Sequence, residues 1–256
     1  MQLRKNKVKK IFKSRKVNYG IWNGIVDTYA GEICAGAGFD WVLIDGEHAP
    51  FDLRSTIVQM QIMEKYDTGV IVRPPTGDPV LIKQLLDAGA QTLLIPMVDT
   101  VEQAEQLVAA MRYPPNGIRG VGTALARAAQ WNRVPDYLLK AEKELCLIVQ
   151  VESTQGMENI DAISKVKGVD GVFIGPADLS ASMGYIGQSN HKKVKAEVKR
   201  GIKIISKNGK VPGVMAIDEK LIKEYVKAGA EMMGVAIDSF MLAQATTKLA
   251  SSFDKD

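Results

Sequence analysis

The sequence contains little cysteine and no long apolar run, and both shortages narrow the class of protein. Only two cysteines occur among 256 residues. Cys34 and Cys146 are too few and too far apart to form a disulfide framework or a CxxC site, so we expect reduced thiols and a cytoplasmic protein. No stretch reaches the roughly 18 apolar residues that a membrane span needs. The first residues also lack the apolar core of a signal peptide, so we expect neither secretion nor a membrane partner.

Glycine-rich phosphate-binding motifs are missing as well. The glycines at 36 and 38 do not open a GxGxxG fingerprint, because Trp41 occupies the position of the third glycine. No P-loop is present. These absences argue against a nucleotide-binding fold of either common kind.

The net charge of +4 comes from one segment. The first 16 residues hold eight basic side chains and no acidic one, which leaves 25 of the 33 basic residues against 29 acidic residues elsewhere. The body of the protein is therefore mildly acidic, and we expect no nucleic-acid partner for it. Val8, Ile11 and Phe12 lie at helical spacing within the basic segment. They predict either an arm that contacts RNA or a membrane surface, or an amphipathic helix that closes one end of the fold.

Short apolar runs alternate with longer amphipathic segments along the whole chain. The runs predict eight strands, at residues 17–22, 39–44, 69–72, 92–95, 145–151, 171–174, 211–215 and 231–236. Helices are predicted between them at residues 79–88, 101–111, 157–164, 194–206 and 219–228. Strands that alternate with helices indicate parallel β-α-β units. Eight units in a chain of this length predict a single (β/α)8 TIM barrel over residues 1–256.

One segment breaks the regular spacing. Residues 113–122 are rich in turn formers, and the irregular stretch continues through Arg127, Trp131 and Arg133 before the next strand. An insertion of this length predicts a functional loop or lid, or equally a contact between subunits.

Polar residues follow three of the predicted strands at the points where they end. Asp45, Glu47 and His48 come after an apolar run, while residues 150–152 and 175–178 close two later strands. In a parallel barrel the carboxyl ends of all strands meet at one end of the molecule, where barrel enzymes carry their catalytic groups. The sequence therefore predicts an enzyme with one pocket formed from these segments.

Glu152 and Asp178 are the candidate metal ligands. They end adjacent strands, which lie about 4.8 Å apart, so both carboxylates can reach one cation. Two carboxylates completed by water and substrate oxygens suit Mg²⁺ or Mn²⁺, and Co²⁺ and Zn²⁺ are further candidates. The alternative is that both carboxylates form salt bridges with lysines at the barrel mouth.

Arg73 and His48 are the candidate groups for binding and proton transfer. Two prolines follow Arg73 and deny it a continuing strand, so its guanidinium is expected over the barrel mouth. There its bidentate fork would suit a 2-oxo acid, and replacement by alanine would stop turnover without unfolding the protein. The alternative for Arg73 is a structural ion pair.

Histidine ordinarily titrates near neutral pH, so His48 is either the proton-transfer group or an ordinary polar residue. The other histidine, His191, lies in a polar stretch and is expected to be exposed. No predicted strand ends in lysine, which argues against an imine mechanism.

These motifs resemble those of the HpcH/HpaI aldolase family, the class II pyruvate-dependent aldolases. The resemblance covers nearly the whole chain and is most specific at residues 43–50, 118–128, 150–152 and 171–184. It implies metal-dependent cleavage of a 4-hydroxy-2-oxo acid, such as 4-hydroxy-2-oxoheptane-1,7-dioate or a 2-keto-3-deoxy sugar acid, to pyruvate and an aldehyde. Oxaloacetate decarboxylation in the same pocket and a non-catalytic 2-oxo acid-binding module are the alternatives.

The resemblance also implies roles for individual residues. Glu152 and Asp178 match the positions that hold the metal. His48 matches the acid–base group, supported by Asp87 from a neighbouring helix or subunit, and Asp45 would orient water at the metal. Family members usually form hexamers, built from dimers that exchange C-terminal helices.

The pyruvate pocket follows from the same resemblance. Arg73 would bind pyruvate and stabilise enolate charge, and the remaining pocket positions are Gln150, Gly175, Ala177 and Met215. The sequence departs from the family pattern at Asn23, at residues 27–29 and at Ala236. We expect these departures to contact the aldehyde half of the substrate.

Overall fold

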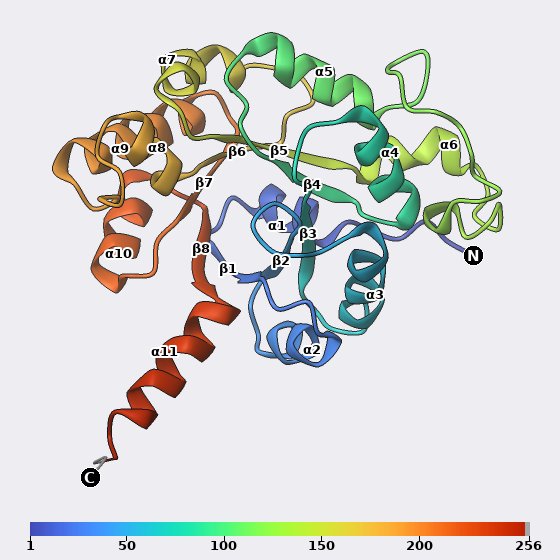
Figure 1. The fold of residues 1–256 in the computed structure, drawn as a ribbon. Helices are drawn as coiled ribbons and strands as arrows, with labels where there is room; N and C mark the ends of the chain where they lie inside the picture. The colour runs from blue at the N-terminus through green and yellow to red at the C-terminus, as the bar shows by residue number, and fades with distance from the viewer. Residues whose placement is uncertain (254–256) are drawn as a thin grey trace.

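The computed structural model describes residues 1–253, in which eight parallel strands form a closed barrel in the order β1 to β8 (Figure 1). The strands are β1 (Asn18–Asn23), β2 (Trp41–Asp45), β3 (Gly69–Arg73), β4 (Thr92–Ile95), β5 (Cys146–Val151), β6 (Gly171–Ile174), β7 (Val211–Met215) and β8 (Met232–Ile237). The predicted TIM barrel is confirmed.

Helices surround the barrel and close one of its ends. They are α1 (Lys7–Ser14), α2 (Thr28–Gly36), α3 (Leu53–Met63), α4 (Pro79–Ala88), α5 (Val101–Met111), α6 (Tyr137–Lys140), α7 (Thr154–Ile163), α8 (Pro176–Ser182), α9 (Lys192–Lys207), α10 (Glu219–Ala228) and α11 (Asp238–Ala250), with 3-10 turns η1 (Arg127–Ala129) and η2 (Ala141–Glu144). None of these helices is long and apolar enough to cross a membrane.

The predicted boundaries were wrong by a few residues where polar side chains bind the backbone. The helix predicted to begin at residue 157 begins at Thr154, because the Ser153 hydroxyl accepts the Gly156 N–H at 2.9 Å and caps the helix. The strand predicted from residue 39 begins at Trp41. Before it, the Asp40 carboxylate accepts the Tyr19 N–H at 2.8 Å.

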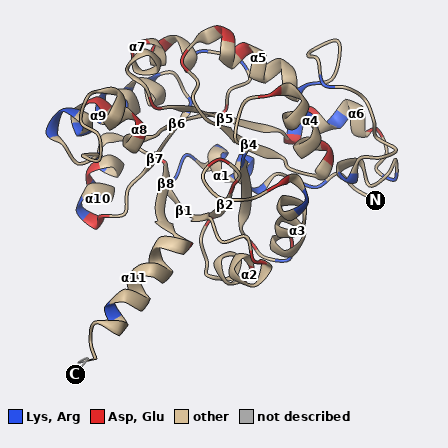
Figure 2. Cartoon of the chain, in the orientation of Figure 1, with Lys and Arg blue, Asp and Glu red and all other residues tan. Residues whose placement is uncertain are grey.

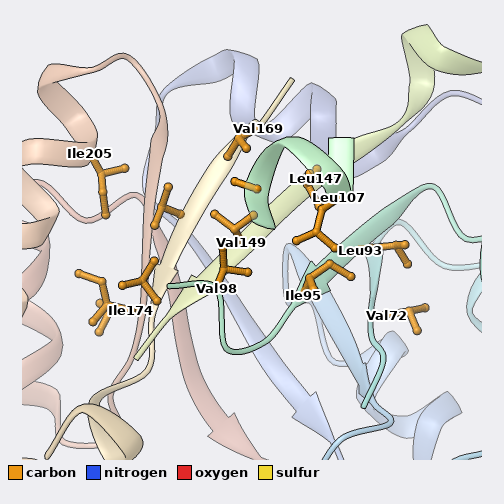
Figure 3. Close-up of a cluster of buried hydrophobic side chains, with 14 of the residues drawn as sticks. Val72, Leu93, Ile95, Val98, Leu107, Leu147, Val149, Val169, Ile174 and Ile205 are labelled. Atoms are coloured by element: carbon orange, nitrogen blue, oxygen red, sulfur yellow. The ribbon is translucent and has the colours of Figure 1, made fainter. Parts of the chain in front are cut away.

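Side chains that alternate along the strands build two apolar layers. One layer lies between the strands and the surrounding helices, where Val72, Leu93 and Ile95 pack near Leu107 of α5 (Figure 3). The other fills the barrel, where the Trp22 ring lies 5.6 Å from that of Trp41. Gly20 makes room for this edge-to-face pair, because a Cβ there would lie 2.0 Å from the Trp41 ring. The interior is therefore packed rather than open.

The basic amino-terminal segment forms α1, which covers the amino ends of the strands. Val8 and Phe12 are buried in the barrel interior, and a Cβ at Gly69 would lie 2.6 Å from Val8. Lys10 and Lys13 on the other face are exposed. The interpretation as an amphipathic closing helix is confirmed, and the apolar spacing needs no RNA or membrane to explain it.

The irregular segment after α5 lies at the end of the barrel opposite the strand carboxyl ends. A helix that follows a parallel strand runs back toward the strand amino ends, so the insertion between α5 and β5 begins and finishes there. It holds its own small core around Tyr137. The prediction that this segment forms a lid over the site of its own chain is therefore wrong. The alternative, a contact between subunits, stays a prediction, and the exposed side chains of Ile118, Val121 and Leu125 are consistent with it.

The last helix, α11, projects away from the barrel (Figure 1). It carries almost no charge along its length (Figure 2), and its side chains Phe240, Met241, Leu242 and Leu249 are exposed. Apolar residues on a helix normally face a core. The exchange of this helix with a second copy stays a prediction.

Candidate active site

A cavity of about 800 Å³ opens at the carboxyl ends of the strands. Side chains from the segments that follow β1, β2, β3 and β5 to β8 line it. Among the predicted site residues, the structure brings together Asp45, His48, Arg73, Gln150, Glu152, Gly175, Ala177, Asp178 and Met215. The register of the barrel therefore gathers residues that lie up to 170 positions apart in the sequence.

A second cavity of about 590 Å³ lies at the opposite end, but three of the four cations that line it already have partners. Lys9 donates to the Leu145 carbonyl at 2.6 Å, Lys210 donates to the Val169 carbonyl at 2.7 Å, and Arg112 pairs with Glu142 at 3.1 Å. These contacts hold the amino end of the barrel together. The cavity at the carboxyl ends is the candidate active site.

Arg73 ends β3 as a buried cation between two carboxylates. Its Nε and Nη2 donate to the two oxygens of Asp45 at 2.9 and 2.7 Å, and its Nη1 lies 2.9 Å from Glu47 Oε2. The fork that we predicted for a substrate carboxylate is thus taken by Asp45. A buried guanidinium requires such compensation, because desolvating an unpaired charge is costly. Arg73 therefore forms the structural ion pair of the alternative and also lines the cavity.

Asp45 also holds the turn that presents His48. Its Oδ1 accepts the N–H groups of Glu47 at 3.1 Å and His48 at 3.4 Å. Asp45 therefore positions neighbouring groups of the site. Its role in orienting water at the metal stays a prediction.

The imidazole of His48 lies at the cavity mouth. Its side chain is 66% exposed, and Nε2 lies 3.8 Å from Glu47 Oε2. Burial raises the pKa of Glu47. The charges of Arg73 and His48 lower this pKa, whereas those of Asp45 and Asp178 raise it further. The ring is therefore free to meet a substrate beside an acidic neighbour.

Glu152 is the least exposed carboxylate among the residues that line the cavity. Its Oε1 accepts the Met97 N–H at 2.9 Å, and its Oε2 contacts the amide of Gln150. Gly175 gives this oxygen its space, since a Cβ there would lie 2.4 Å from it. Burial raises the pKa of Glu152, and the charges of Asp178 and Glu47 add to this against the hydrogen bonds from Gln150 and Met97.

Asp178 lies in the first turn of α8 and is exposed to the same cavity. With Glu152 it supplies two carboxylates at the cavity, and no lysine among residues 1–253 forms the salt bridge with either that the alternative required. Across residues 1–253 no cluster of three or more His, Cys, Asp or Glu is arranged to hold a metal. A cation here would therefore keep open positions, which suits an ion that also binds water or substrate oxygens.

The charges of the inner cavity support a cation at this place. Asp45, Glu47, Glu152 and Asp178 surround a single guanidinium, that of Arg73. If all are ionised, three negative charges remain uncompensated. The residues present therefore fit a divalent cation.

Asp87 is the one predicted site residue that the structure does not bring into the cavity. It lies near the C-terminal end of α4, and its Oδ1 accepts from Arg119 Nη2 at 2.6 Å. The end of a helix that follows a barrel strand lies at the amino end of the sheet, away from His48. The prediction that Asp87 supports His48 within the same chain is therefore wrong. A contribution from a second copy stays a prediction.

Some functional residues escaped the sequence reasoning. Glu47 belongs to the motif that we singled out, but its contact with Arg73 depends on the pairing of β2 with β3. Met97 contributes a backbone N–H, which leaves no signal in a sequence. The departures from the family pattern at Asn23, residues 27–29 and Ala236 do not line the cavity, so their predicted contact with the aldehyde is wrong for this chain. Asn23 instead binds Asp238 at 2.7 Å.

A closed parallel barrel with acids, a guanidinium and an imidazole gathered at its carboxyl ends defines an enzyme of the TIM-barrel class. The family model described as HpcH/HpaI aldolase/citrate lyase matches residues 18–245, and the chain belongs to this family. It is an enzyme of the carbon–carbon lyase class.

Curated relatives and a solved structure agree with this assignment. The chain is 56% identical to the hydroxypyruvate/pyruvate aldolase of Deinococcus radiodurans over 91% of its length and 84% of the relative. It is 49% identical to the 4-hydroxy-2-oxo-heptane-1,7-dioate aldolase of Escherichia coli over 97% of its length and 95% of the relative. The crystal structure of a family protein from Burkholderia cenocepacia superposes with a TM-score of 0.91 at 35% identity, covering 96% of this chain and 98% of that one.

Proposed function

We propose that this chain cleaves a 4-hydroxy-2-oxo acid to pyruvate and an aldehyde in a reversible reaction that requires a divalent metal. The observation that carries the proposal is the convergence of Glu152, Asp178, Arg73 and His48 on one cavity. The names of the relatives, pyruvate aldolases and a 4-hydroxy-2-oxo acid aldolase, support the same chemistry.

Glu152 and Asp178 would hold the metal. The support for this is the acidic excess of the inner cavity and the space that Gly175 leaves beside Glu152. When bound, the divalent cation supplies a Lewis acid that stabilises negative charge on oxygen. Oxygen ligands of this kind suit Mg²⁺ or Mn²⁺, with Co²⁺ and Zn²⁺ as alternatives.

The side chains of the cavity bind the 2-oxo acid and move the proton. Arg73 keeps one hydrogen of Nη2 for substrate oxygens, because Asp45 takes its Nε and the other Nη2 hydrogen. Its Nη1 lies 2.9 Å from Glu47 Oε2 and 3.4 Å from Gln150 Oε1. Gln150 and the backbone around Ala177 form the adjoining wall. His48 takes the proton of the C4 hydroxyl as the C3–C4 bond breaks, and the electron pair of that bond remains on the pyruvate fragment as its enolate.

The direct test is a screen for pyruvate release from 4-hydroxy-2-oxo acids. We expect release that stops with EDTA and returns with Mg²⁺ or Mn²⁺. Oxaloacetate in the same screen compares decarboxylation with aldol cleavage. Pyruvate binding by calorimetry, with no cleavage of any compound under any metal, would reject the proposal and favour a binding module.

Replacing His48 by glutamine should lower the cleavage rate about 100-fold, the lower end of the range for acid–base groups, because the ring is largely exposed. The matched control is His191→Gln, since His191 caps α9 outside the cavity. Rates of pyruvate release at saturating metal measure both. Equal losses in the two variants would contradict the role of His48.

The assembly of the chain is part of the proposal. Exchange of α11 between two copies would cover Phe240, Met241 and Leu242, and a trimer of such dimers would give a hexamer. In that assembly Asp87 of one copy would support His48 of another, a state that sedimentation of the full chain can test. A cytoplasmic setting is consistent with Cys34 and Cys146, which are buried free thiols.

A further inference from the structure

We infer that Met97 is a positioning residue of the metal site, because the left-handed conformation of its backbone aims an N–H at one oxygen of Glu152 and leaves the other oxygen for the cation. This role rests on the proposed metal site at Glu152. It belongs to the backbone of a residue whose side chain does not line the cavity.

Met97 has a backbone conformation that a side chain of its kind rarely adopts. Its φ is +56°, in the left-handed region where Cβ crowds the following carbonyl oxygen. The side chain is 51% exposed, so its packing within the chain does not explain the conformation. Residues in such conformations cluster at functional sites, where the surrounding structure holds them in place.

The N–H of Met97 has its acceptor in the metal site. β4 ends at Ile95, and two residues later this N–H donates to Glu152 Oε1 at 2.9 Å. The second oxygen, Oε2, lies beside Gly175 of the cavity wall, where a Cβ would come within 2.4 Å of it. Glu152 therefore has one oxygen fixed by the backbone and one oxygen at the cavity.

The neighbouring strand fixes the residue that follows Met97. The Val98 N–H donates to the carbonyl of Gln150, which lies two residues before Glu152 on β5 and the turn after it. The angle φ describes rotation about the bond between N and Cα. Once Val98 is fixed, φ of Met97 sets the direction of the Met97 N–H, and the usual negative φ would swing this N–H away from Oε1.

Polar contacts with α7 and its cap hold the next residue, Asp99. The Asn159 side-chain amide donates to the Asp99 carbonyl at 2.7 Å, and the Ser153 hydroxyl donates to the Asp99 carboxylate. Gly156 permits the close approach, since a Cβ there would lie 2.9 Å from Asp99 Oδ1. All these contacts lie within one chain, so they persist whether or not a second copy covers the Met97 side chain.

Mn²⁺ affinity of the full chain, measured from the electron paramagnetic resonance of free Mn²⁺, tests this role without turnover. Met97→Gly keeps the N–H and takes a positive φ without cost, so its Kd should stay within about twofold of the wild type. Met97→Val forces a β-branched residue into that conformation, which it strongly disfavours. We expect its Kd to rise at least about tenfold, the lower end of the effect of losing a partner that orients a metal ligand.

Two results would overturn the inference. Equal affinities in the wild type, Met97→Gly and Met97→Val would show that the conformation at this position does not matter. A loss in Met97→Gly as large as that in Met97→Val would assign the effect to the side chain.

A second variant removes the donor itself. Replacing Met97 by its α-hydroxy acid exchanges the N–H for an ester oxygen and keeps the side chain, so it does not depend on how valine is tolerated. We expect the Kd for Mn²⁺ to rise at least about tenfold here as well. An unchanged Kd would overturn the inference.

Gln130→Val is the matched control for Met97→Val. Gln130 has a φ of +48° and lies in the insertion before β5, outside the cavity lining. Valine imposes the same backbone cost there, so the melting temperature in EDTA should fall in both valine variants, whereas Mn²⁺ affinity should fall only in Met97→Val. An equal loss of affinity in Gln130→Val would overturn the inference, because the effect would then follow from lost stability.

The wild type and Glu152→Gln separate this role from the proposed function. Mn²⁺ binding that Glu152→Gln abolishes, together with an unchanged Kd in Met97→Val and in the ester, would overturn the inference alone. A wild type that binds no Mn²⁺ would overturn the proposed metal site and the inference with it.

Discussion

Replacing Glu152 by glutamine will lower metal-dependent pyruvate release about 1,000-fold and remove the rise in melting temperature that added Mg²⁺ or Mn²⁺ gives the wild type. The amide keeps the shape of the side chain but loses the charge that would hold the cation. Loss of one electrostatic contribution at a reacting oxygen typically lowers kcat about 100- to 1,000-fold. We expect the loss of the metal to give an effect at the upper end of this range. A ligand that binds only the native state stabilises it, so the melting curves report binding without turnover.

The same substitution should stabilise the protein in EDTA at neutral pH. Burial raises the pKa of Glu152 above its ordinary value of 4.5, so the folded state binds this proton more tightly than the unfolded state does. The penalty for the buried charge is therefore absent below the unfolded value, grows as the pH rises, and is complete above the folded pKa. Glu152→Gln should thus melt above the wild type at pH 8 and lose this advantage toward pH 4.5.

Glu158→Gln is the control, because Glu158 lies on α7 with an exposed side chain outside the cavity. It should change neither turnover nor melting. If Glu152→Gln kept its metal-dependent melting shift, Glu152 would not be a ligand.

Replacing Arg73 by alanine will abolish measurable turnover and lower the free energy of unfolding by about 3–5 kcal/mol. The substitution leaves the buried carboxylate of Asp45 and the partly buried carboxylate of Glu47 without their shared cation, and removal of one partner from a buried ion pair typically costs this much. The sequence alone suggested loss of turnover with an intact fold. The structure changes that expectation, because the guanidinium holds two strand ends together.

Arg73→Lys separates charge from geometry. Lysine keeps the positive charge but cannot bind both oxygens of Asp45, so we expect a smaller stability loss than for alanine, with turnover still lowered about 100-fold. Urea unfolding and pyruvate release measure the two effects. Arg54→Ala, an exposed residue of α3, should lie within about 0.5 kcal/mol of the wild type. If Arg73→Ala had the same free energy of unfolding as the wild type, the ion pairs of Arg73 with Asp45 and Glu47 would not stabilise the fold.

Much of the fold could be predicted because its signals are local. Each buried strand is a short apolar run, as in residues 92–95, and β4 has those bounds. The metal-ligand candidates could be proposed for the same reason, since Glu152 directly follows such a run and Asp178 lies four residues beyond the end of another. Errors arose where a side chain binds the backbone, as Ser153 does at the start of α7.

The sequence by itself determined the barrel and the identity of the residues at the strand carboxyl ends, because apolar periodicity and strand order follow from the chain alone. It left two interpretations of the basic segment, and the burial of Val8 and Phe12 decided for the closing helix α1. Only the tertiary structure decided which charges meet. The pairing of Arg73 with Asp45 and Glu47 and the placement of Asp87 away from the cavity depend on strand register and helix direction. Such contacts join residues distant in the sequence, and no local pattern records them.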